Sequence, residues 1–131
     1  MLNIYRWTIA ISTALWLVFW FLPYFDAGWY TNEEINLLMW DGWAAKIQTS
    51  DTSTWLLFAA WLSCSIGLFF TIKYTRECFV VLVVGTTLLS YFMGFRVTAP
   101  IDSVLLNFVT MADGAVIYMA YFSSVSERFK Q

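Results

Sequence analysis

Few residues in this chain could do chemistry, and the most distinctive of them is an aspartate inside a long apolar segment. The sequence contains no histidine and two cysteines, so it offers no imidazole for haem or zinc and no His-based nucleophilic triad. Asp113 lies within the apolar stretch from Ser103 to Phe122. Because a charged carboxylate that faces lipid is costly, we expect Asp113 to face the protein interior and to be paired or protonated.

Polar residues accompany Asp113 along the same predicted helix. Ser103, Asn107, Thr110 and Gly114 recur at helical spacing and share one face, which Asp113 flanks. We interpret Asp113, Asn107 and Thr110 as a candidate polar site within the membrane. Its function would be a proton or cation site, or a polar hook for another subunit's helix; the structural alternative is a protonated aspartate bonded to hydroxyl groups of the bundle. The partners at matching depth are Thr86, Thr87, Ser90, Ser63 and Cys64.

The composition indicates the elements that must position these residues. Of the 131 residues, 60% are apolar, 21% are aromatic and only 12% are charged, which is unlike an ordinary soluble domain. Apolar stretches of about 20 residues can cross a bilayer as helices, and they lack the alternation of barrel strands. The sequence therefore predicts an all-α integral membrane protein, with residues 1–131 forming a single membrane domain. We expect an antiparallel bundle of four transmembrane helices, namely Thr8–Phe25, Thr54–Ile72, Cys78–Phe95 and Ser103–Phe122, whose last three members form consecutive hairpins.

The distribution of Lys and Arg predicts the orientation of these spans. In a four-span arrangement, five positive charges lie on the side of the two termini and two lie on the other side. The positive-inside rule then places both termini in the cytoplasm, as expected for a multi-pass protein of a bacterial inner membrane. The five are Arg6, Lys73, Arg76, Arg128 and Lys130, and the two are Lys46 and Arg96.

The first loop is the only long connection, and its pattern predicts an extra amphipathic helix outside the membrane. Thr31 and Glu34 have the spacing of a capping box, which indicates a helix over about 32–47. A narrow acidic stripe would leave most of that helix apolar. Such a helix would lie in the outer interface, cover the mouth of the bundle, or contact another protein. The candidate partner surface consists of Leu38, Met39, Trp40 and Trp43.

Two smaller patterns concern packing within the bundle. Ala59, Ser63 and Gly67 form a row of small residues at a spacing of four, which favours close approach of a neighbouring helix. Cys64 and Cys78 fall at different depths of the bilayer in the four-span arrangement. We therefore expect no disulfide between them.

These features favour one function and leave a second open. The leading hypothesis is a non-catalytic, small polytopic membrane protein that binds another membrane protein, as an accessory subunit or an immunity-type protector against a membrane-acting toxin. The alternative is a homo-oligomeric transport or channel component that uses Asp113 as a proton or cation site. We expect no enzymatic activity, because acid and base groups are not clustered, and no cofactor. The expected partners are the lipid bilayer and another membrane protein or a second copy, and the net charge of −2 argues against nucleic acid.

Overall fold

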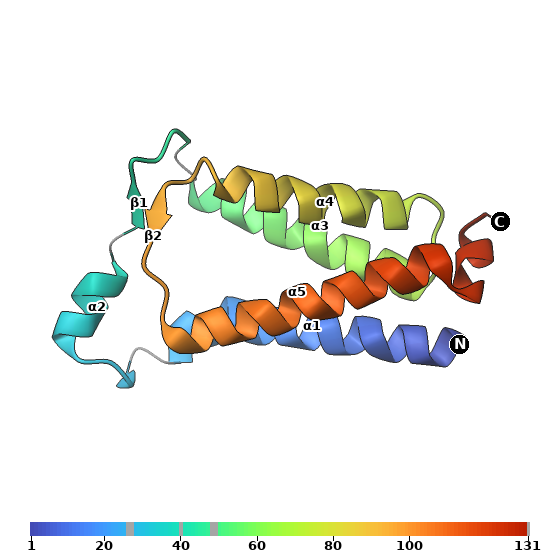
Figure 1. Cartoon of the computed structure of the whole chain (residues 1–131), viewed down its shortest axis with the longest axis horizontal. Helices are drawn as coiled ribbons and strands as arrows, with labels where there is room; N and C mark the ends of the chain where they lie inside the picture. Colours follow the sequence, from blue (N-terminus) through green and yellow to red (C-terminus); the bar gives the residue numbers. More distant parts are fainter. Residues whose placement is uncertain (26–27, 40, 48–49, 131) are drawn as a thin grey trace.

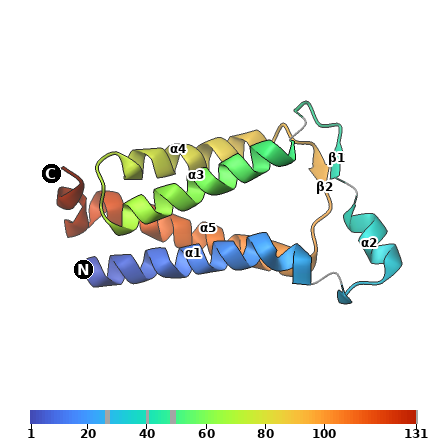
Figure 2. The same ribbon diagram turned by 180° about the vertical axis from the view of Figure 1, so that it is seen from behind.

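Long helices run side by side along one axis of the protein, and a small cap covers one end (Figures 1 and 2). The computed structural model describes residues 1–25, 28–39, 41–47 and 50–130. The end of the molecule that holds both termini is called the termini end below, and the opposite end the cap end. The long helices are α1 (Leu2–Phe25), α3 (Asp51–Phe69), α4 (Thr75–Ser90) and α5 (Pro100–Phe122). The cap consists of α2 (Asn32–Leu38), β1 (Asp41–Trp43) and β2 (Phe95–Arg96), and the 3-10 helix η2 (Ser124–Lys130) lies at the termini end.

Within the described ranges, three helices are long and apolar enough to cross a membrane, namely α1, α3 and α5. This supports the expectation of a helical protein that associates with membranes. The fourth predicted span, Cys78–Phe95, differs from α4, which has 16 residues and ends at Ser90. Its apolar segment continues in tight turns, in which the N–H groups of residues 91–93 donate to carbonyls three residues earlier. Gly94, with φ of +86°, then adopts a left-handed conformation that cannot continue a helix.

The long helices begin earlier than the apolar pattern predicted, and the added first turns of α3 and α5 contain polar residues. The α3 helix starts at Asp51 instead of Thr54, after Ser50 accepts a hydrogen bond from the Ser53 N–H. The α5 helix starts with Pro100, a residue suited to the first turn, where no N–H partner is needed. An apolar stretch in the sequence marks the apolar middle of a helix and does not include its capped ends.

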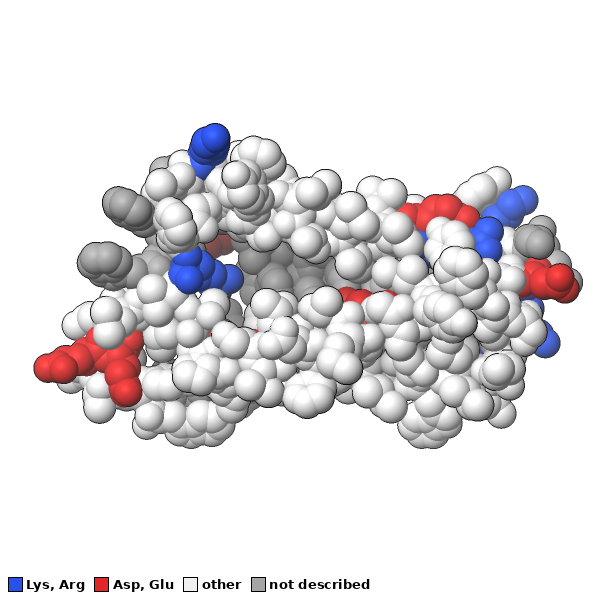
Figure 3. All heavy atoms as spheres, in the orientation of Figure 1, with Lys and Arg blue, Asp and Glu red and all other residues white. Residues whose placement is uncertain are grey.

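The helices form two pairs that diverge toward the cap. The α1 helix packs mainly on α5 and α3 mainly on α4, while contacts between α1 and α3 join the pairs (Figure 1). The α4 and α5 helices, although consecutive in the chain, make few contacts with each other, and Figure 3 shows a hollow along the face between them. The predicted hairpin is therefore tight for α3 and α4 and splayed for α4 and α5. The reason is that the connection over residues 91–99, which includes β2, runs across the cap before α5 begins.

The buried core lies toward the termini end. Tyr5 is completely buried and meets Phe129 of η2 edge-on, with ring centroids 6.3 Å apart. The guanidinium of Arg76 lies over the rings of Phe129 and Tyr121, at 5.7 and 4.9 Å from their centroids. Because η2 also buries Val125, it closes this end of the helix pairs. The core cluster comprises Tyr5, Ile9, Trp61, Leu68, Phe79, Val116, Ala120, Val125 and Phe129.

Stacked aromatic rings join the two helix pairs between this core and the cap. The rings of Trp16 on α1 and Trp61 on α3 are nearly parallel, with centroids 4.1 Å apart. Phe58 lies 5.1 Å from Trp16 and 4.8 Å from Trp20. Trp20 in turn meets Trp55 at 5.9 Å. The rings thus form a continuous aromatic stack that leads from the middle of the helices to the cap end.

Gly67 is the member of the small-residue row that packs against another element. Ala59 and Ser63 are exposed, whereas Gly67 is buried where α3 turns into α4. A Cβ atom added at Gly67 would collide with the Thr75 side chain, while the same atom at the exposed Gly114 of α5 would meet nothing within 4 Å. Only one position of the row therefore packs closely against another element, and the row as a whole does not form a helix–helix interface.

Gly67→Ala is expected to lower the free energy of unfolding by about 1 kcal/mol, because the α3–α4 turn must shift to admit the methyl group. Thermal unfolding of the detergent-solubilised protein measures this change. Gly114→Ala is the matched control and should be neutral or slightly stabilising, since alanine favours a helix. Equal effects of the two substitutions would contradict the packing role of Gly67.

The cap differs from the predicted amphipathic helix over 32–47, which is wrong beyond its first two turns. The capping box forms as expected: Thr31 accepts from the Glu34 N–H, and the Glu34 carboxylate accepts from the Thr31 N–H at 2.8 Å. The α2 helix nevertheless ends at Leu38, and Gly42 and Ala44 have φ of +76° and +60°. A left-handed backbone cannot continue an α-helix, so no helix can run through residues 42–44, and residues 41–43 form the strand β1 instead.

The two short strands tie the first loop to the connection between α4 and α5. β1 pairs with β2 in an antiparallel ladder, with Asp41 opposite Arg96 and an irregularity before Trp43. The N–H groups of Lys46 and Ile47 also donate to the carbonyl of Phe92, at 2.9 and 3.2 Å. Backbone hydrogen bonds thus fix the position of the cap over the two helix pairs.

Candidate functional site

Asp113 lies where α1 and α5 pack together, and its side chain is buried. The Ser12 hydroxyl of α1 donates a hydrogen bond of 2.5 Å to Asp113 Oδ1, and both residues are buried. Ser12 was not among the partners expected from the sequence. The hydroxyls of Thr86 and Thr87 instead donate to backbone carbonyls of their own helix. The interior position of Asp113 agrees with the prediction, whereas the predicted partners are wrong.

Asn107 and Thr110 do not join Asp113 in one site. Both are exposed, and the Thr110 hydroxyl donates to the Leu106 carbonyl of its own helix at 2.8 Å. The sequence placed Asp113 at the flank of their face, and in the structure Asp113 is buried against α1 while Asn107 and Thr110 are exposed. Asp113 and Ser12 are therefore a buried polar pair that links two helices.

The described residues include no group of three or more Cys, Asp or Glu side chains arranged to hold a metal ion. Cys64 and Cys78 are free thiols, as their predicted depths implied. Among the described residues, two cavities that could receive another molecule lie at the cap end.

The predicted partner surface is only partly visible. Leu38 is half-buried, Met39 is 75% exposed, Trp40 lies outside the described residues and Trp43 belongs to β1. Other apolar residues of the cap are exposed that the sequence had not indicated, including Phe95 at 71%. We call the exposed set the apolar cap patch; it consists of Leu37, Met39, Phe95 and Val97.

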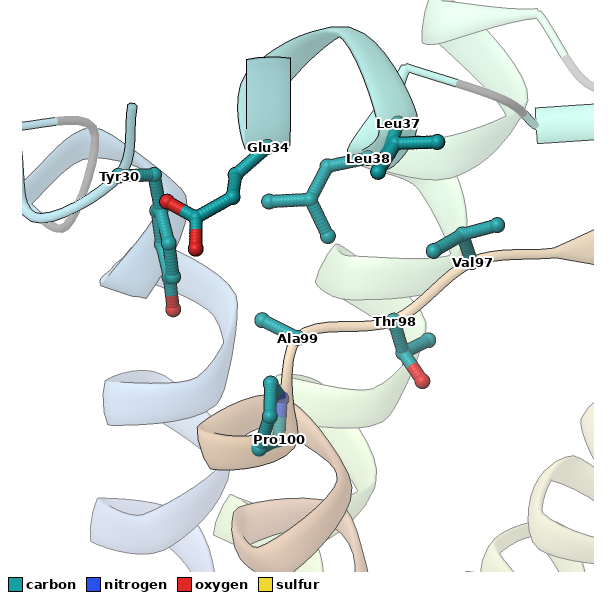
Figure 4. A pocket seen from close by; sticks show the side chains of 8 residues that line it. All are labelled: Tyr30, Glu34, Leu37, Leu38, Val97, Thr98, Ala99 and Pro100. Carbon is teal, nitrogen blue, oxygen red and sulfur yellow. The ribbon is translucent and has the colours of Figure 1, made fainter. Parts of the chain in front are cut away.

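A small cavity separates α2 from the segment that leads into α5. It has a volume of about 180 Å³ and contains Leu37 and Val97 of the apolar cap patch. In Figure 4 the Glu34 carboxylate and the Tyr30 ring lie on one side of this cavity, and Leu37 and Val97 lie together on the other. Hydrogen bonds from the backbone N–H and hydroxyl of Thr31 lower the pKa of Glu34. The capping box therefore loses its stabilising effect only when the pH falls through that lowered pKa.

A larger cavity, called the cap-end cavity below, opens between the helix pairs where they diverge. It has a volume of about 480 Å³ and is bounded by the last turns of α1, the first turns of α3 and α5, and β2. Aromatic and charged side chains meet there, which is typical of ligand-binding cavities. The lining residues are Phe19, Trp20, Pro23, Tyr24, Asp51, Thr54, Trp55, Arg96 and Asp102.

Sequence reasoning missed this cavity, although two spacings pointed to it. Trp20 and Tyr24 are one helical turn apart at the end of α1, and Asp51 and Trp55 are one turn apart at the start of α3. The spacing within each helix places these side chains on one face, but it does not require that the faces of two helices meet. Comparison of the chain with family models, with curated proteins and with solved structures finds no match.

Proposed function

We propose that the protein is a non-catalytic, multi-pass membrane protein that acts by binding another membrane protein through the apolar cap patch, as an accessory subunit or an immunity-type protector. The exposure of this patch carries the proposal. Apolar side chains exposed along α1, α3 and α5 have lipid as a solvent. The cap lies beyond the ends of these helices, where exposed Leu, Met and Phe favour contact with a protein (Figure 1).

The cap is also held in a fixed shape, which favours binding. The capping box starts α2, and the β1–β2 ladder holds Phe95 beside the first loop. A surface that is already ordered loses less conformational entropy when it binds than a mobile loop does. The apolar cap patch is therefore suited to recognition of a partner.

The proposed topology has four spans, with α4 as the fourth and both termini in the cytoplasm. Three observations support it. The termini lie at the same end in Figure 1, the α4 segment continues in turns to Met93, and charged residues gather at the two ends of the face in Figure 3. The excess of Lys and Arg belongs to the termini end. A bacterial inner membrane is the proposed location.

Reporter fusions test this topology. A fusion at Gln131 should be active only with a cytoplasmic reporter, and a fusion within residues 28–39 only with an extracytoplasmic one, because of the positive-inside bias. A Gln131 fusion that is active outside would contradict the four-span arrangement.

Charge placed in the apolar cap patch should abolish partner binding. Leu37→Glu combined with Met39→Glu would force two carboxylates into an apolar interface, so we expect a loss of at least about tenfold in the co-purified subunit. The measurement is stoichiometry after mild-detergent purification from native membranes. Asn32→Glu combined with Asn36→Glu, which adds the same two negative charges at exposed polar positions of α2, is the control. Retention of the foreign subunit by the double variant would contradict the proposal.

The alternative, a homo-oligomeric transport or channel component that uses Asp113, has less support. A transport site requires polar groups that continue a path. Asp113 bonds Ser12 inside the α1–α5 interface, while Asn107 and Thr110 face away from it. A homo-oligomer without a foreign subunit in the same purification would favour this alternative over the first proposal.

A further inference from the structure

The cap-end cavity has aromatic walls from two helices. Trp20 and Tyr24 line it from α1, and Trp55 lines it from α3. The Trp20 and Trp55 rings lie 5.9 Å apart at an angle of 65°, so the two walls meet at a corner. Trp55 is 48% exposed despite its contacts with Trp20 and Phe58, and part of its ring surface remains open.

The charge of this cavity is negative. Its lining contains the carboxylates of Asp51 and Asp102 and the guanidinium of Arg96, which leaves a net charge of −1. Arg96 and Asp102 each take part in another interaction. Asp51 is exposed and lies one helical turn before Trp55, so its carboxylate and that ring belong to the same face of α3.

We infer that the cap-end cavity binds an organic ammonium group, with the rings of Trp20, Tyr24 and Trp55 around the cation and the Asp51 carboxylate as its counter-charge. Aromatic faces attract ammonium groups through the negative charge of the ring face, and several rings around one cation are the usual solution for quaternary ammonium ligands. A first-turn aspartate alone would stabilise the α3 N-terminus, but that role needs no aromatic cavity beside it.

The position of the cavity identifies two sources for such a group. The cavity opens where the membrane-crossing helices end, which is the level of lipid headgroups. A zwitterionic phospholipid would present its headgroup ammonium there from the bilayer, whereas a soluble amine would enter from water. The volume of about 480 Å³ accommodates either group. This inference does not depend on the partner protein proposed above.

Calorimetric titration of the full chain in a non-ionic maltoside detergent tests the soluble source, with tetramethylammonium and choline as probes and sodium chloride as the ionic control. We expect saturable binding of the organic cations, and a loss of affinity of about tenfold in Asp51→Asn and in Trp55→Leu. Glu33→Gln, an exposed acid of α2 outside the cavity, and Trp7→Leu, at the other end of the molecule, should bind like the wild type. Equal losses in these controls would overturn the site.

Native mass spectrometry tests the lipid source, using the protein after exposure to phosphatidylethanolamine or phosphatidylglycerol in mixed micelles. Retention of phosphatidylethanolamine by the wild type and its loss in Asp51→Asn would assign the site to a headgroup. Binding of choline or tetramethylammonium without lipid retention would assign it to a soluble amine. The inference is overturned if neither soluble probe binds and phosphatidylethanolamine is retained no better than phosphatidylglycerol. Asp51→Asn leaves the apolar cap patch unchanged. A failure of the ammonium-site inference would therefore not affect the co-purification result.

Discussion

Replacing Trp61 with alanine is expected to lower the free energy of unfolding by about 3 kcal/mol. Trp61 is 6% exposed, stacks on Trp16 at 4.1 Å and meets Phe79 at 6.2 Å. Its ring thereby connects α1, α3 and α4. Alanine would leave a cavity at this junction. The three helices are packed against one another, so their backbones cannot move far enough to fill the space. The value lies at the lower end for buried aromatic residues, since lipid removes part of the drive to bury apolar surface.

Thermal or denaturant unfolding in detergent measures the loss. Trp7→Ala is the matched control, since Trp7 is 70% exposed and an aromatic side chain is removed there without opening a cavity. The control should change stability by less than about 1 kcal/mol. If both tryptophans prove equally dispensable, the aromatic stack does not hold the helix pairs together.

The second large loss is expected for Asp113→Leu, which should lower the free energy of unfolding by about 2 kcal/mol. The substitution removes the acceptor of the Ser12 hydroxyl and leaves that hydroxyl buried against an apolar side chain. Asp113→Asn should keep assembly and stability close to those of the wild type, since its amide oxygen can still accept from Ser12. Unfolding in detergent and size-exclusion profiles report both quantities.

A comparison of two buried serines separates the interhelix bond from burial itself. Ser12 bonds across to α5, whereas Ser65 donates only to the Trp61 carbonyl of its own helix, at 3.1 Å. We therefore expect Ser12→Ala to destabilise more than Ser65→Ala, and Ser12→Ala to add little once Asp113→Leu is present. If Asp113→Asn assembled normally but lost biological activity, the transport alternative would gain over the structural role.

The apolar pattern of the sequence was sufficient to predict the long helices, because a bilayer allows an apolar segment of that length few other conformations. The capping box predicted the start of α2 for an equally local reason, as Thr31 and Glu34 are three residues apart. The predicted end of this helix, at about residue 47, was wrong. Asp41 and Gly42 form a dipeptide typical of turns, and greater weight on Gly42 would have predicted the break.

The contacts between helices could not be predicted from depth alone. Several hydroxyls lie near the depth of Asp113, and which of them faces it depends on the rotation and the neighbours of each helix. The expected hairpin order favoured α4 as the helix that faces Asp113. In the structure α5 packs on α1 instead, and Ser12 of α1 contacts Asp113. The cap-end cavity was missed for the same reason, because its walls come from α1 and α3, and the spacing within one helix does not show which helix it faces.

The β1–β2 ladder also constrains how the protein can be assembled during synthesis. The first strand precedes α3 and its partner follows α4, so the whole α3–α4 hairpin separates two strands that must pair. In the proposed four-span topology, the first loop therefore waits without its partner strand until the ribosome has delivered Phe95 and Arg96 to the same side of the membrane. In that topology, insertion of the α3–α4 hairpin, and not synthesis of the loop, sets the time at which the cap acquires its folded shape.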